Sequence, residues 1–151
     1  MENLSFDTGR VTMSINGDAS RTISFNPTDP DIVNRFLLLA DTCEKKEKEF
    51  EKKVEETNRK AMAEQDPLAR ARMKNDLDQE IDRFFREKVN EIFGEDADKS
   101  IFGEVSPTAV TGNGTTVFQN FVQAILPVFE QEIKRRETET NKIIEYYRKK
   151  R

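Results

Sequence analysis

The chain has 151 residues, of which 36% are charged and 35% are hydrophobic, and 25 basic against 29 acidic residues leave a net charge of −4. The absence of His excludes Ser-His-Asp and Cys-His catalysis and every zinc site that uses imidazole. One cysteine, Cys43, excludes an internal disulfide and a cysteine-only zinc site. The length fits one domain with a lean core, and we expect a protein that is not an enzyme.

Residues 1–26 predict a β-hairpin. Hydrophobic residues alternate with Ser and Thr over 11–15 and over 22–25, and the turn formers 16–20 lie between them. Leu4 and Phe6 could add a short strand. Because two or three strands are unstable alone, the apolar face of the hairpin needs a helix to cover it.

A long helix is expected over 30–64, since Asp29 is a good N-cap and Pro30 suits the first helical position. Its first turns are apolar and can pack on the hairpin. Beyond them, 13 of the 17 residues from Glu44 to Lys60 are charged. A thin apolar stripe continues through this part of the helix at Cys43, Phe50 and Val54. We therefore expect a solvated, projecting helix with a narrow seam.

A second helix is predicted over 67–93, capped by Asp66 and ended by Gly94, with an apolar stripe that suits folding back on the first helix. A short helix over 96–102 and a loop rich in Gly follow.

The last helix of the domain is expected over 115–133, with a Thr cap and a broad apolar face. Pro127 should kink or split it. Residues 134–151 read as a basic helical tail with 8 basic and 3 acidic groups, whereas 61–133 hold 7 basic and 14 acidic groups. The fold class is α+β and predominantly helical: a domain over 1–133, with the hairpin packed on three or four helices, and long charged helical extensions.

The acidic clusters are interpreted as structural. Asp76, Asp78, Glu80 and Asp82 alternate, so a helix places them on opposite faces, away from a common metal. Asp96 and Asp98 begin like a calcium loop, but its sixth and twelfth positions hold Ile and Pro, which favours helix-capping acids. The loop 112–116 lacks the Lys of a phosphate-binding loop. Cys43 is expected to be a packed thiol. We expect no metal and no cofactor.

Two segments, 44–64 and 134–151, have apolar stripes that are too narrow to form a full hydrophobic core. Either they pair with each other within the chain, which is the simpler alternative, or they engage a partner helix. The residues predicted to contact a protein partner are Phe50, Val54, Ile143, Tyr146 and Tyr147. The basic tail with its two Tyr could also bind nucleic acid, but the acidic body argues against that.

The N-terminus does not read as a signal peptide, and no apolar run approaches the length of a membrane span. A reducing, cytoplasmic location is expected.

Two stretches taken together resemble a known family. The first is ISFNPTDP at 23–30, which a charged helix follows. The second runs from IFGE and IFG at 92–103 through a loop with Gly to FQNFVQAI at 118–125. This layout is similar to tail assembly chaperones of siphophage-type phages and prophages. The resemblance implies a non-enzymatic protein in the host cytoplasm that binds the helical tape measure protein and recruits tail tube subunits. Self-association into a homo-oligomer stays open. The alternative is a structural virion or scaffolding protein of the tail or neck that acts by self-assembly.

Overall fold

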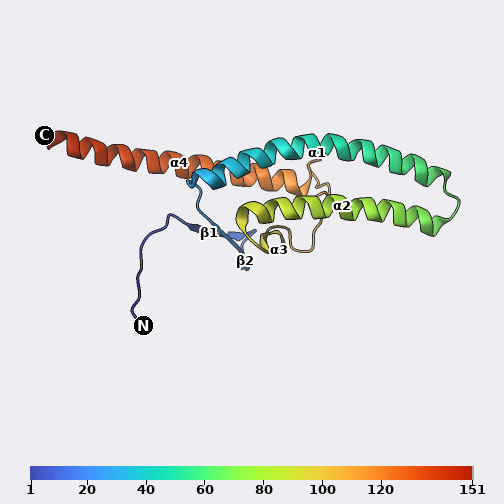
Figure 1. The fold of residues 1–151 in the computed structure, drawn as a ribbon, viewed down its shortest axis with the longest axis horizontal. Helices are drawn as coiled ribbons and strands as arrows, with labels where there is room; N and C mark the ends of the chain where they lie inside the picture. The colour runs from blue at the N-terminus through green and yellow to red at the C-terminus, as the bar shows by residue number, and fades with distance from the viewer. Residues whose placement is uncertain (151) are drawn as a thin grey trace.

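The computed structural model describes residues 1–150 and shows a small body from which two helical projections leave at opposite ends (Figure 1). A two-stranded hairpin is followed within this range by four helices, which confirms the α+β, predominantly helical class. The elements in chain order are β1 (Val11–Ile15), β2 (Asp18–Phe25), α1 (Pro30–Ala63), α2 (Pro67–Phe93), α3 (Ala97–Phe102) and α4 (Val117–Lys149).

The hairpin pairs β1 with β2 in antiparallel register, with Val11 opposite Phe25. Asn16 and Gly17 both have positive φ, 51° and 76°, the geometry of the tight turn that suits an Asn-Gly pair. The third strand suggested by Leu4 and Phe6 is absent from the described chain, and both side chains are exposed. Gly9, at φ 79°, turns the backbone out of the extended conformation before β1 begins.

α1 and α2 begin with matching caps and fold back on each other as the αα-hairpin seen in Figure 1. The carboxylates of Asp29 and Asp66 each accept a hydrogen bond at 3.0 Å from the backbone N–H two residues on. The charged half of α1 therefore lies on α2. Of the two alternatives for 44–64 and 134–151, the pairing of these segments with each other is not formed, because they project in opposite directions.

α4 is one uninterrupted helix, so the expected boundary between a core helix ending at 133 and a separate tail does not exist. Of the two outcomes expected at Pro127, a kink or a split, the split is absent. Pro127 and Gln123, whose carbonyl loses its helical hydrogen bond, are both exposed. Water can satisfy that carbonyl, and the helix continues through the proline.

α3 is tied to its neighbours by two polar residues. The Arg21 guanidinium of β2 donates to the carbonyls of Ser100 and Ile101 at 2.8 and 2.9 Å. Asp98, 8% exposed, accepts from the Asn90 amide at 2.9 Å and is paired with Arg86 at 3.2 Å. Asp98 is thus a link between α2 and α3. The expectation that Asp96 and Asp98 are helix-capping acids holds for their positions, since Asp96 is the N-cap residue and Asp98 lies in the first turn, but Asp96 makes no side-chain capping bond.

No helix within residues 1–150 is both long enough and apolar enough to cross a bilayer.

Candidate protein-binding surface on α4

The N-terminus of α4 is fixed by a capping box. The Thr116 hydroxyl accepts from the backbone N–H of Gln119 at 3.1 Å, and the Gln119 side chain accepts from the backbone N–H of Thr116 at 2.9 Å. The loop before it adds two bonds to the helix start, from Val117 N–H to the Ala109 carbonyl and from Phe118 N–H to the Pro107 carbonyl. Thr116 is thus the cap of α4, as the sequence indicates, and the carbonyls of Pro107 and Ala109 complete the helix start.

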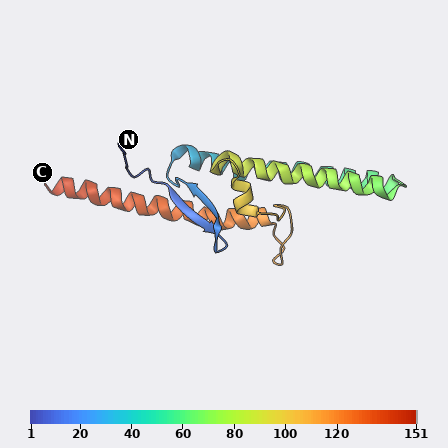
Figure 2. The same ribbon diagram turned by 90° about the horizontal axis from the view of Figure 1, so that it is seen from below.

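Aromatic rings hold the first half of α4 on the body. Phe118 and Phe129 are 4% and 3% exposed. The ring of Phe129 stacks on Phe36 of α1 at 4.7 Å between centroids and meets Phe25 of β2 at 5.4 Å. Phe118 meets Phe85 of α2 at 4.6 Å. Seen from below in Figure 2, the hairpin crosses α4, which agrees with the contact to Phe25.

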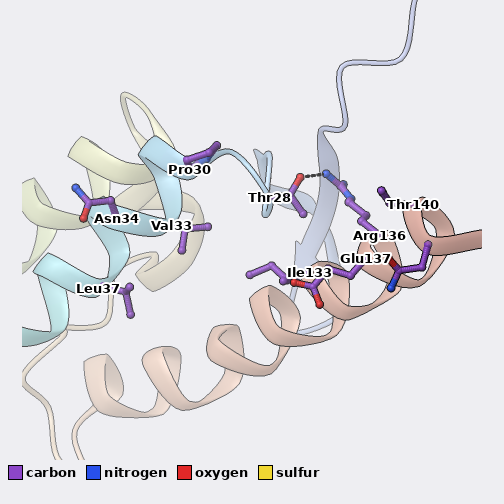
Figure 3. A pocket seen from close by; sticks show the side chains of 10 residues that line it. Thr28, Pro30, Val33, Asn34, Leu37, Ile133, Arg136, Glu137 and Thr140 are labelled. Atoms are coloured by element: carbon purple, nitrogen blue, oxygen red, sulfur yellow. Dashed lines mark hydrogen bonds between the residues drawn. The ribbon is translucent and has the colours of Figure 1, made fainter. Parts of the chain in front are cut away.

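Arg136 marks the end of the attached part of α4. Its guanidinium donates to the Asn26 side chain at 2.9 Å, to the Gly9 carbonyl at 2.7 Å and to the Thr28 hydroxyl (Figure 3). It also lies 3.5 Å from the Glu132 carboxylate. One side chain therefore joins α4 to the N-terminal segment and to the turn between β2 and α1.

Beyond Arg136, every residue from Glu137 to Lys150 is exposed, and α4 continues as a helix to Lys149. We call residues 137–150 the extension. Its large apolar side chains are between 44% and 64% exposed: Ile143, Ile144, Tyr146 and Tyr147. The two Tyr rings meet edge to face at 5.5 Å, and the Lys150 ammonium lies 4.6 Å from the centre of the Tyr146 ring. The extension thus presents apolar and basic groups together.

A groove opens where the extension leaves the body, between the first turns of α1 and the middle of α4 (Figure 3). Its volume is about 670 Å³. The α1 wall includes Val33 and Leu37, and the α4 wall includes Ile133 and Thr140. Leu37 is 56% exposed, so apolar surface is open to solvent on this wall. A groove with apolar walls beside a bare amphipathic helix is suited to binding another helix.

The charge along α4 changes from mixed to basic. Glu132 pairs with Arg135 at 2.7 Å, and the hydrogen bond from Arg135 lowers the pKa of the Glu132 carboxyl below its ordinary value. The last positions, 148–150, are all basic. Basic side chains at a helix C-terminus also complement the helix dipole.

The five residues predicted to contact a partner divide into two groups. Ile143, Tyr146 and Tyr147 lie together on the extension. Val54 is 38% exposed and belongs to α1, which with α2 projects from the body in the direction opposite to the extension (Figure 1). Phe50 is not an exposed residue, contrary to the expectation. It is 7% exposed and packs edge to face on Phe84 of α2 at 5.5 Å. The narrow stripe on α1 is covered by α2 at this point.

Sequence reasoning missed two residues of this surface. Ile144 belongs to the same exposed patch and has helical spacing to Tyr147, so the periodicity could have identified it. Arg136 belongs to the basic cluster of the tail, and no local signal distinguishes it, because the three groups to which it donates hydrogen bonds lie more than 100 residues away in the chain.

The remaining candidates for chemistry have structural partners. Among the residues described, no cluster of three or more Cys, Asp and Glu side chains could hold a metal. Glu80 pairs with Lys53 at 2.6 Å, and Asp82 with Arg86 at 3.0 Å. Cys43 is 4% exposed, and burial raises the pKa of its thiol to about 12. Cys43 is a packed thiol, as expected.

Comparison with family models, with curated proteins and with solved structures finds no match for this chain.

Proposed function

We propose that this protein is a non-enzymatic assembly factor of the phage tail assembly chaperone type, which binds helices of a tape measure protein in the host cytoplasm and recruits tail tube subunits. The observation that carries the proposal is the extension, a helix exposed at every position from Glu137 to Lys150 that bears Ile143, Tyr146 and Tyr147. A helix in water keeps such side chains available for a partner with its own apolar stripe.

Two separate arguments support the helical partner and its identity. The groove beside Ile133 and the row of apolar side chains beyond it support a helix as the ligand, because a helix offers apolar groups at matching intervals. The tape measure protein and the tail tube subunits come from the resemblance carried by stretches 23–30, 92–103 and 118–125. The apolar faces of aggregation-prone tape measure helices need to be shielded by a binding partner until the tail is assembled.

The test is co-expression with the tape measure protein encoded in the same tail module. Wild-type protein should keep the tape measure protein soluble, and a Tyr146→Asp, Tyr147→Asp double variant should lose this effect while keeping its helical circular dichroism. Val110, 71% exposed on the loop before α4, provides the control Val110→Asp, which should behave like wild type. Tape measure protein that stays insoluble with wild type would contradict the proposal.

The location of the protein after assembly separates the two functions considered. A tail assembly chaperone is present in infected cells and missing from purified virions. If the protein is found in purified virions at a fixed ratio to the tail subunits, it is a structural or scaffolding component, and the chaperone proposal is wrong.

A further inference from the structure

The exposed stripe of the extension and the groove lie on one face of α4. Ile133 and Thr140 line the groove, and Ile144 and Tyr147 follow at intervals of four and three residues from Thr140, which keeps them on the same side of the helix. A helix that lies along the extension therefore runs into the groove. There it reaches the apolar side chains of Val33 and Leu37 on α1 (Figure 3).

The charges beside this stripe differ between its two ends. Near the body the stripe is flanked by Glu130 on one side. On the other side lies Glu132, which is already paired with Arg135 and Arg136. At the tip the stripe is flanked by Arg148 and Lys150 on those same two sides. A helix that binds here most favourably has apolar side chains along one face and basic residues at the end that approaches the body. The extension itself has both properties.

We propose that the occupant is a second copy of this chain, and that two copies pair antiparallel through their extensions. Thr140 of one copy lies opposite Thr140 of the other, and the Tyr147 ring of each copy enters the groove of the other beside Ile133. The pairing is isologous, because each copy uses the same surface. Arg148 of each copy faces Glu130 of the other.

The charge distribution selects this direction of pairing. In a parallel pair the two basic tips, which hold Arg148, Lys149 and Lys150, would lie side by side and repel each other. In the antiparallel pair each basic tip meets Glu130 of the other copy, a carboxylate without an ion-pair partner among the described residues. The pairing uses the same surface as the proposed function, so a tape measure helix would have to displace the second copy. It does not depend on that function, because it is measured on the purified chain alone.

The first test is sedimentation equilibrium of the full chain at micromolar concentration. We expect a mass of twice 17.5 kDa and a dissociation constant that rises more than tenfold in Tyr147→Asp. Val110→Asp is the matched control and should leave the dimer intact. A wild-type monomer, or a Tyr147→Asp variant that dimerises as tightly as wild type, overturns the proposal.

The second test exchanges charges across the pair. Arg148→Glu alone and Glu130→Lys alone should each weaken self-association, because each places like charges opposite each other at both ends. An equimolar mixture of the two variants should form a heterodimer at least tenfold more tightly than either forms a homodimer. A mixture that stays as weak as its components overturns the contact between Arg148 and Glu130.

The third test fixes the direction by disulfide cross-linking in a Cys43→Ala background. Thr140→Cys should cross-link with itself. Tyr147→Cys should cross-link with an Ile133→Cys copy and not with a second Tyr147→Cys copy. Efficient homotypic cross-linking of Tyr147→Cys would show parallel pairing and overturn the antiparallel arrangement.

Discussion

The ring of Phe129 on α4 stacks on the ring of Phe36 on α1, with centroids 4.7 Å apart and planes inclined by 26°. The two residues are 93 positions apart in the sequence, and both are buried. Together with the contact of Phe129 to Phe25, this stack holds α4 where the hairpin and α1 meet. The direction in which the extension leaves the body depends on it.

Replacing Phe129 with Ala should therefore cost about 3–5 kcal/mol of unfolding free energy, the range for a buried Phe that leaves a cavity. Leu126, one turn away and 39% exposed, is the matched control, and Leu126→Ala should cost less than about 1 kcal/mol. Urea unfolding followed by circular dichroism measures both. Equal losses would show that α4 is not held by the ring stack.

The two α1 residues that the sequence groups together should behave differently. Phe50 is 7% exposed between Phe84 and Phe85, so Phe50→Ala should lower the unfolding free energy by about 3 kcal/mol. Val54 is 38% exposed, and Val54→Ala should cost under about 1 kcal/mol. Thermal unfolding measures the difference. A Phe50→Ala variant as stable as wild type would mean that Phe50 does not pack between α1 and α2 in solution.

The elements themselves were predictable because their signals are local. Asp29 and Asp66 cap the two long helices from positions next to the prolines that begin them, and Asn16-Gly17 makes the turn of the hairpin. These are contacts within a few residues, and the sequence displays them directly.

The arrangement of the helices was less predictable, because it depends on contacts between distant residues. The stripe containing Phe50 is equally compatible with a partner helix and with α2. Pro127 suggests a break, but whether a helix breaks there depends on how its free carbonyl is satisfied, and this side of α4 is exposed. The role of Arg136 was unpredictable for the same reason, since Asn26 and Gly9 are close to it only in the folded chain.

The stability of the α2–α3 contact should depend on pH through Asp98. Burial acts to raise the pKa of Asp98, but hydrogen bonds from Asn90 and Arg86 outweigh it, and the pKa lies below the ordinary 3.8. The folded state therefore favours the ionised form. The stabilisation by ionised Asp98 is present above pH 3.8. It is lost as the pH falls through the pKa that Asp98 has in the folded state, which is lower than 3.8.

Asp98→Asn should accordingly cost about 2 kcal/mol near neutral pH, in the range for hydrogen bonds to charged groups, and the difference from wild type should shrink below pH 3.8. Urea unfolding at a series of pH values measures it. Asp96→Asn removes an exposed carboxylate paired with Lys99 and should change stability by less than about 0.5 kcal/mol. A pH-independent loss in Asp98→Asn would contradict the role of its charge.

Cys43 should resist thiol reagents while the chain is folded. Burial raises the pKa of its thiol to about 12, so almost no thiolate exists at pH 8, and the side chain is 4% exposed. Labelling with a disulfide reagent should proceed only at the rate of unfolding and become complete in urea. Val110→Cys, on the exposed loop before α4, is the control and should react at once. Rapid labelling of Cys43 in the native chain would mean that α1 opens locally.

Arg136 should determine how firmly the N-terminal segment is attached to α4. Its guanidinium donates to the Gly9 carbonyl at 2.7 Å and to Asn26 at 2.9 Å, so Arg136→Met keeps the aliphatic stem in the groove wall but removes these bonds. We expect a loss of about 2 kcal/mol in unfolding free energy, because charge-assisted hydrogen bonds from one group are lost together.

Hydrogen exchange locates this effect. In Arg136→Met the amides of residues 7–10 should exchange faster. Amides near the turn between α1 and α2, from 60 to 70, should be unchanged, because the lost bonds to Gly9, Asn26 and Thr28 lie near the other end of α1. Arg135→Met is the matched control: Arg135 is exposed and pairs only with Glu132 among the described residues, so exchange at 7–10 should stay at the wild-type rate. If both variants leave that exchange unchanged, Arg136 does not anchor the N-terminal segment.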